Sequence, residues 1–63
     1  MNKYEYDIID ERVANDNEII EVLNELGKDG WHVFRLDKER NDFAKSSGKR
    51  YEITIYAARK INV

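Results

Sequence analysis

The sequence predicts a small α+β domain, in which three strands and one helix follow the chain order β-α-β-β. Three observations predict it. Residues 3–9 and 50–59 alternate between apolar and polar side chains, a helix-length segment between them carries an apolar face, and a short apolar run follows that segment. A chain of 63 residues has room for one domain, residues 1–63, with a thin core. It contains no cysteine and no proline, so self-association is the expected source of extra stability.

The first strand is expected over residues 3–9, where Tyr4, Tyr6 and Ile8 alternate with acidic side chains. A helix is expected to follow, from about Asp16 to Leu26. Before it, Asn15 and Glu18 have the three-residue spacing of an N-terminal capping box. Its apolar residues recur at helical spacing on one face, at Ile19, Ile20, Val22, Leu23 and Leu26.

Two glycines follow the helix. Gly27 occupies the position where a left-handed residue commonly ends a helix, and Gly30 permits a sharp entry into the next strand. That second strand is expected over residues 31–36, with Trp31 packed against the helix and His32 pointing outward. Its alternation is imperfect, because Trp31 and Val33 would lie on one face and Phe34 and Leu36 on the other.

A long polar connection is expected over residues 37–49, and the third strand over residues 50–59. A helical crossover between the first two strands makes them parallel, and the third strand can return antiparallel between them, in order 1-3-2. We expect the helix to cover the face that carries Tyr4, Tyr6, Ile8, Ile53 and Ile55. The opposite face would be too apolar to stay uncovered, which predicts a homo-oligomer that associates through Ile9, His32, Phe34, Leu36, Thr54 and Tyr56.

The sequence also resembles a known family. The motif K-Y-E-Y at positions 3–6, the run L-N-E-L-G-K-D-G-W-H-V at 23–33 and a last alternating strand ending at Arg59-Lys60 resemble the bacterial and phage domain-of-unknown-function family numbered 4177. The resemblance spans nearly the whole chain and implies a β-α-β-β fold, but it implies no reaction. The sequence departs from the family pattern at His32, where an acidic residue is usual, and in its long basic segment from Arg35 to Arg50.

Charge is distributed unevenly along the chain. Residues 1–30 carry three basic and nine acidic side chains, whereas residues 31–63 carry eight basic and four acidic ones. Either two solvated surfaces of opposite sign or a basic patch for an anionic partner would account for this pattern. The turn Ser46-Ser47-Gly48 lies within the basic segment and could wrap a phosphate. The candidate partner-binding or anion-binding residues are Arg35, Lys38, Arg40, Lys45, Lys49 and Arg50.

Other chemistries find little support in the sequence. The glycines at 27 and 30 follow a helix and precede a strand, which is the reverse of a phosphate-binding loop. His32 is the only histidine and has no cysteine to join it, so neither a metal site nor a cofactor is expected. No apolar run approaches the length of a membrane span, and the charged N-terminal segment is unlike a signal peptide, so we expect a cytoplasmic protein (host cytoplasm, if phage-encoded).

Three functional hypotheses follow. The first is a non-enzymatic protein-interaction module that self-associates through the open sheet face or an edge strand and binds a partner protein through residues 35–50. The phage members of the similar family suggest an inhibitor or adaptor of a host protein. The second is an anion-binding protein that takes nucleic acid or a nucleotide-like ligand through residues 35–50. The third is an oligomeric enzyme that uses His32 with a carboxylate across a subunit interface.

Overall fold

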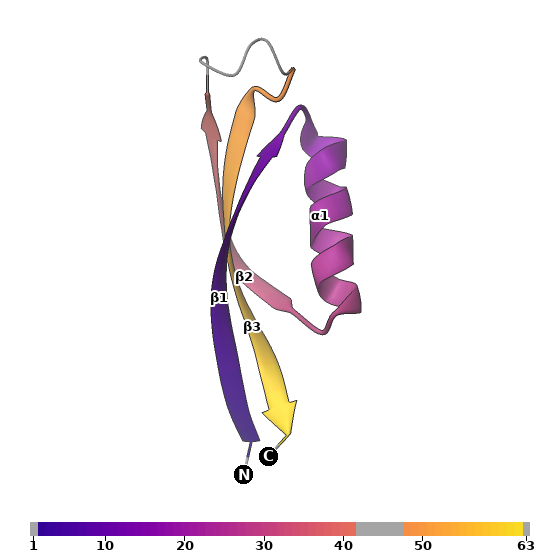
Figure 1. Ribbon diagram of the computed structural model, residues 1–63, viewed down its shortest axis with the longest axis vertical. Helices are drawn as coiled ribbons and strands as arrows, with labels where there is room; N and C mark the ends of the chain where they lie inside the picture. Colours follow the sequence, from indigo (N-terminus) through magenta and orange to yellow (C-terminus); the bar gives the residue numbers. More distant parts are fainter. Residues whose placement is uncertain (1, 42–47, 63) are drawn as a thin grey trace.

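A computed structural model describes residues 2–41 and 48–62 of the chain, with side chains for residues 3–41 and 48–61. Strand β1 (Asn2–Val13) leads into helix α1 (Asp16–Lys28), which is followed by β2 (His32–Arg40) and β3 (Tyr51–Asn62). β3 is the central strand and pairs antiparallel with both neighbours, so that β1 and β2 run parallel in a sheet of order β1-β3-β2. The predicted β-α-β-β order and the 1-3-2 sheet are confirmed (Figure 1).

The two ends of α1 are held by local hydrogen bonds. At the start, the Asn15 side chain accepts a hydrogen bond from the Glu18 backbone N–H at 3.1 Å, and the Glu18 carboxylate accepts one from the Ala14 N–H. This reciprocal arrangement satisfies backbone donors that lack a partner within the helix. The predicted capping pair is therefore present.

The helix ends later than predicted. It continues through Gly27 to Lys28, and the residue with positive φ is Gly30, at +86°. The Gly30 N–H bonds to the Gly27 carbonyl at 3.0 Å and the Trp31 N–H bonds to the Leu26 carbonyl at 3.0 Å, which together form a Schellman motif. The expected left-handed turn is thus correct in kind but lies three residues further along the chain.

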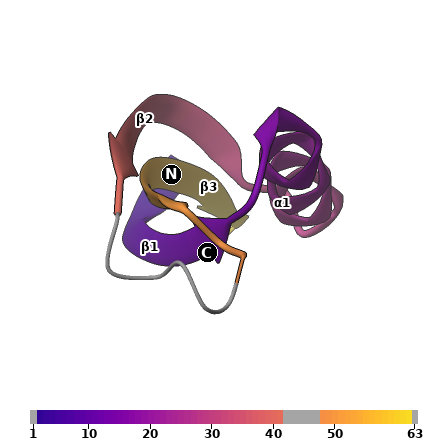
Figure 2. The ribbon, with the colours of Figure 1, turned by 90° about the horizontal axis from the view of Figure 1, so that it is seen from above.

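The core lies between α1 and one face of the sheet. Its buried residues are Val13, Ile19, Ile53, Ile55 and Ala57, and Trp31 packs against them as predicted. We call this side the helix face and the other side the open face. In Figure 2 the helix stands on one side of the sheet, and no described element lies across the other.

The predicted orientation of the first strand is wrong. Ile9, expected on the open face, packs against the core, whereas Tyr4, Tyr6 and Ile8 are exposed on the open face. The reason is that β1 is longer than predicted and pairs with β3 without interruption as far as buried Val13. Since side chains alternate along a strand, the burial of Val13 places the other odd-numbered side chains of β1 on the helix face.

Leu36 is also on the helix face, contrary to expectation. The pairing of β2 with β3 shifts between Val33 and Arg35, which makes Phe34 the extra residue of a β-bulge. Val33 and Leu36 therefore both pack against the core, although three positions separate them. β2 also extends to Arg40, so residues 37–40 of the predicted connection belong to the strand.

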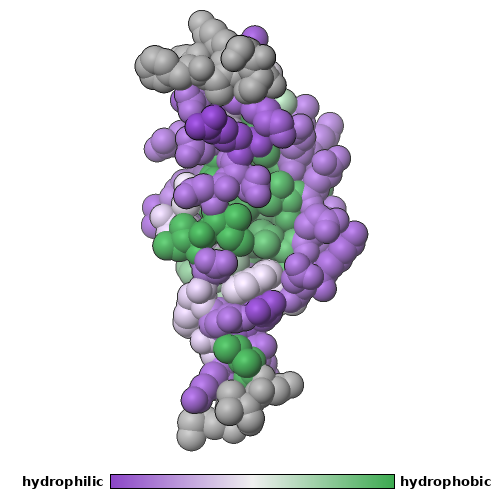
Figure 3. Space-filling model, in the orientation of Figure 1, coloured by the Kyte–Doolittle hydropathy of each residue, from purple (hydrophilic) through white to green (hydrophobic). Residues whose placement is uncertain are grey.

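The molecule is long and thin. Its principal extents are 48 × 16 × 14 Å and its radius of gyration is 13.6 Å. A compact domain of this length would have a radius of gyration of about 11 Å. In Figure 3 apolar side chains emerge near the middle of the molecule, with hydrophilic residues around them. The elongation leaves much of the sheet without a second layer.

Candidate interaction surface

Aromatic and aliphatic side chains gather on the open face from all three strands. We define the aromatic patch as the five residues Tyr4, Tyr6, Ile8, Phe34 and Tyr56. The Phe34 ring lies at its centre. Its centroid is 6.4 Å from that of Tyr6, in an edge-to-face arrangement with an interplanar angle of 81°, and 6.4 Å from that of Tyr56. Contacts of this geometry connect the two edge strands across β3.

The aromatic patch is largely accessible to solvent. The exposed fraction is 70% for Tyr6, 61% for Ile8, 58% for Phe34 and 57% for Tyr4. With large side chains of this kind offering on the order of 200 Å² each, these four expose about 500 Å². A contiguous apolar area of that size matches the largest patches on typical monomers, and such patches are often functional.

The β-bulge in β2 determines where the central ring of the aromatic patch lies. Because Phe34 is the extra residue, it shares the open face with Arg35, which pairs with Tyr56 in the register of β2 and β3. The Arg35 guanidinium lies over the Tyr56 ring, 5.4 Å from the centroid, and pairs with Asp37 at 3.3 Å. Phe34 and Tyr56 were predicted to lie on this face, and they do.

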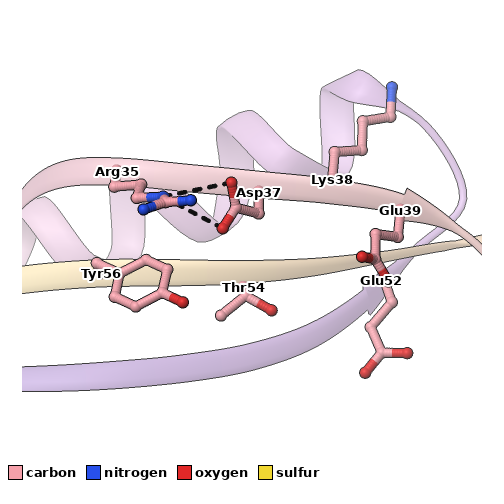
Figure 4. Close-up of a pocket in the computed structure, with 7 residues that line it drawn as sticks. All are labelled: Arg35, Asp37, Lys38, Glu39, Glu52, Thr54 and Tyr56. Carbon is pink, nitrogen blue, oxygen red and sulfur yellow. Dashed lines mark hydrogen bonds and ion pairs between the residues drawn. The ribbon is translucent and has the colours of Figure 1, made fainter.

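The rest of the open face is polar and hollowed. A groove of about 540 Å³ is lined by Arg35, Asp37, Lys38, Glu39, Glu52, Thr54 and Tyr56. Figure 4 shows the Arg35–Asp37 pair within it, and the Glu39 and Glu52 side chains at one end of it. Glu39 and Glu52 are direct partners in the strand register, and like charges in that position repel. Thr54 donates a hydrogen bond to Asp10 on β1 at 2.9 Å.

The candidate basic residues do not converge. Arg35 lies on the open face, whereas Lys38 reaches the helix, where it pairs with Asp16 at 2.9 Å and lies 4.5 Å from the centroid of the Tyr51 ring. The hydrogen bond to Asp16 raises the pKa of Lys38 above its ordinary value of 10.5.

The remaining candidate cations that the structure describes lie at the end of β2 or precede β3. Arg40 and Lys49 are both engaged in interactions, and Arg50, which is exposed, accepts a hydrogen bond at its carbonyl from the Asn41 N–H at 2.6 Å. Lys45, Ser46 and Ser47 lie outside the described residues. The structure therefore brings Arg40 and Arg50 to the same end of the sheet, whereas Arg35 and Lys38 lie on its two opposite faces.

His32 and Thr54 both lie on the open face, as predicted. His32 is exposed at the start of β2, opposite Ala58, and does not line the groove. Within residues 2–41 and 48–62, no group of three or more acidic or histidine side chains has the geometry of a metal site.

Sequence reasoning missed three residues of the patch, Tyr4, Tyr6 and Ile8. The signal that could have placed them is Val13. Counting back from this apolar residue in steps of two reaches Ile9, and leaves the tyrosines on the other side of the strand.

Comparisons with known proteins assign no relative. No family model, no curated protein and no solved structure matches the chain. The resemblance to the family numbered 4177 therefore stays a proposal based on the motifs themselves. In the part of the chain that the structure describes, no helix is long and apolar enough to cross a membrane.

Proposed function

We propose that this chain is a non-enzymatic protein-interaction module that self-associates through its open sheet face. The observation that carries the proposal is the aromatic patch, which lies exposed on the side of the sheet opposite the helix. Aromatic side chains supply large contact area at a low cost in conformational entropy, and they are enriched at the centres of protein interfaces. A second copy of the chain is the partner that this surface fits best.

The accessible surface area of the chain supports the proposal that a second copy covers part of it. Its accessible surface is 4952 Å², whereas a compact monomer of 63 residues would expose about 4,250 Å². The excess of about 700 Å² is close to the area of about 800 Å² that each protein contributes to a standard interface. One copy docked on the open face would cover surface of this extent.

The sheet edges are less suited to association than the face. On β1 the charged residues Glu5, Asp7 and Glu11 lie on the helix face. This is the side on which a further strand, added at the edge, would have to extend the core. On β2 the bulge at Phe34 interrupts the regular ladder. Inward-facing charges and bulges are devices by which proteins prevent edge-to-edge pairing. Association through the face avoids both.

The other two hypotheses have weaker geometric support. Among the candidate cations, Arg35 and Lys38 are already paired with carboxylates and lie on opposite faces of the sheet. The enzymatic hypothesis depends on His32, which lies outside the groove. A heterologous protein partner, as a phage-type inhibitor or adaptor would require, remains compatible with the interaction module and would bind a surface that the dimer leaves free.

Sedimentation equilibrium tests the proposal. We expect the wild-type chain to form a dimer or a higher oligomer at micromolar concentration, and Tyr6→Lys to weaken association at least tenfold, because it places a charge within the patch. The matched control is Ile20→Lys. Ile20 is 54% exposed, on the helix, so this variant makes a similar change outside the open face and should associate like the wild type.

Two results would contradict the proposal. A wild-type chain that stays monomeric throughout the micromolar range would remove it. Equal weakening by Tyr6→Lys and Ile20→Lys would show that the open face is not the interface. If the monomer's melting temperature rose with RNA or nucleotides at low salt and not at high salt, the anion-binding hypothesis would take its place.

A further inference from the structure

The open face has two unlike ends. Each β3 residue on this face forms a row with its cross-strand neighbours on β1 and β2, and we name the row after the β3 residue. The row of Glu52 contains Arg12 and Glu39, and the row of Thr54 contains Asp10 and Asp37. We call these two rows the acidic end, since four of their side chains are carboxylates. At the other end, the row of Lys60 contains Tyr4. The aromatic patch occupies the rows between and extends to Tyr4.

This asymmetry distinguishes two ways of stacking a pair of copies face to face. A two-fold axis parallel to the strands superposes each end on the same end of the partner. A two-fold axis across the strands reverses the strand direction, and superposes the acidic end of each copy on the lysine end of the other. Both arrangements bury aromatic patch against aromatic patch, so hydrophobic burial alone does not choose between them.

We infer that the second copy docks with its strands reversed, about an axis that passes between the rows of Tyr56 and Ala58. The inference rests on the proposed function. In this arrangement the Tyr56 row lies over the Ala58 row of the partner copy, and the Thr54 row, with Asp10 and Asp37, lies over the Lys60 row. Each lysine then faces carboxylates, and the acidic ends of the two copies lie far apart.

Electrostatic repulsion disfavours the alternative. With the axis parallel to the strands, four carboxylates would face four others across a sheet spacing of about 10 Å. That spacing is comparable to the screening length of about 8 Å at physiological salt, and screening by salt would be weaker where the interface excludes water. Glu39 and Glu52 already oppose each other within one copy, so the acidic end can least accept further negative charge.

The chain has no cysteine, so single introduced cysteines report on distance without interference. The informative positions are Glu52 and Lys60, near opposite ends of the central strand. From a strand rise of about 3.3 Å per residue and a sheet spacing of about 10 Å, reversed docking separates the two Glu52 positions by about 35 Å and brings Glu52 of one copy within about 12 Å of Lys60 of the other. Docking with the strands aligned would give about 10 Å and about 28 Å instead.

The experiment uses Glu52→Cys and Lys60→Cys, alone and mixed, with a short bismaleimide cross-linker and with spin-label distance measurement. In the mixture, we expect the cysteine at position 52 of one copy to cross-link to the cysteine at position 60 of the other. In Glu52→Cys alone, we expect no cross-link and a long distance between the two spin labels. The matched control is Asn24→Cys, at an exposed position on the helix, which should not cross-link in either arrangement. The association of each variant is first measured by sedimentation, and cross-links and label distances are recorded at a concentration at which that variant is associated.

The outcomes separate this inference from the proposed function. A monomer would overturn both. A dimer in which Glu52→Cys cross-links to itself at a short label distance would keep the open-face interface and overturn the reversed docking. A dimer in which neither pair comes close would place the interface elsewhere and overturn both.

Discussion

The guanidinium of Arg59 lies over the indole ring of Trp31, with its central carbon 4.5 Å from the ring centroid. The same side chain pairs with the Glu5 carboxylate, to which its Nε donates a hydrogen bond at 2.6 Å. Arg59 thus connects the C-terminal part of β3 with β1 and with the residue that precedes β2. Three segments that are distant in the sequence meet at this one side chain.

Removing this connection should lower stability. We expect Arg59→Ala to reduce the free energy of unfolding by about 1–2 kcal/mol, from the lost cation–π contact and the lost charge-assisted hydrogen bond. Arg59→Lys should lose less stability than Arg59→Ala, because the lysine ammonium group keeps the positive charge. It should still be less stable than the wild type, because an ammonium group lacks the planar arrangement of donors of a guanidinium. Urea denaturation measures both, with Lys60→Ala as the control in the same strand, and equal losses for Arg59→Ala and Lys60→Ala would contradict the role given to Arg59.

The two glycines near the end of the helix should respond oppositely to alanine. Gly30 has φ of +86°, so Gly30→Ala should destabilise the fold by about 1–2 kcal/mol. Gly27 is helical and has open space around its Cβ position, so Gly27→Ala should stabilise the fold by about 0.5–1 kcal/mol. Thermal unfolding compares the pair directly. A Gly30→Ala variant that folded normally but no longer associated would instead assign this turn a binding role.

Asn15 should contribute to stability through the start of the helix. Its side chain accepts the Glu18 N–H, and we expect Asn15→Ala to cost about 1 kcal/mol. Asn15→Asp preserves an acceptor and should retain most of the stability, aided by the helix dipole. The free energy of unfolding from urea titration gives both values, and a neutral Asn15→Ala would mean that solvent replaces the cap without loss.

Lys38 should give the fold a pH dependence in the alkaline range. Its pKa is raised above 10.5 in the folded chain, chiefly by the hydrogen bond to Asp16, so the folded state binds this proton more tightly than the unfolded state. The stabilisation is therefore fully present below pH 10.5, and is lost as pH rises through the raised value.

The melting temperature of the wild type should exceed that of Lys38→Met at neutral pH. The difference should shrink above pH 10.5, where the unfolded and then the folded chain lose the proton. Asp16→Ala should remove the same difference, because it removes the acceptor of the Lys38 hydrogen bond. A gap between wild type and Lys38→Met that stayed constant from pH 7 to 11 would show that the lysine acts through its aliphatic stem alone.

The sequence was informative where the signals were local. The capping pair Asn15–Glu18, the helical spacing from Ile19 to Leu26 and the alternation of β3 each depend on neighbours a few positions apart, and each is present in the structure. The crossover rule then made the sheet order follow from the element order. Gly30 and Trp31 also fulfil their expected roles, although the helix end moved from Leu26 to Lys28.

The sequence was misleading where burial decided between two equivalent patterns. β1 alternates in either register, and its orientation depends on whether the strand continues to Val13, as its pairing with β3 shows that it does. That register places Ile9 rather than Tyr6 on the helix face. The bulge at Phe34 has no sequence signal of its own, since neither glycine nor a turn motif marks it. For the candidate site, Phe34 and Tyr56 could be placed from the sequence, whereas the pairing of Lys38 with Asp16 joins residues 22 positions apart, and requires the folded chain.

The bulge in β2 also separates the effect of a deletion on the core from its effect on the surface. Deleting Phe34 would leave Val33 and Leu36 two positions apart, so that regular alternation would keep both side chains on the helix face. The core would then retain its residues, whereas the open face would lose the ring at the centre of the aromatic patch. A chain shortened by this one residue should therefore keep the fold but lose much of its capacity to associate.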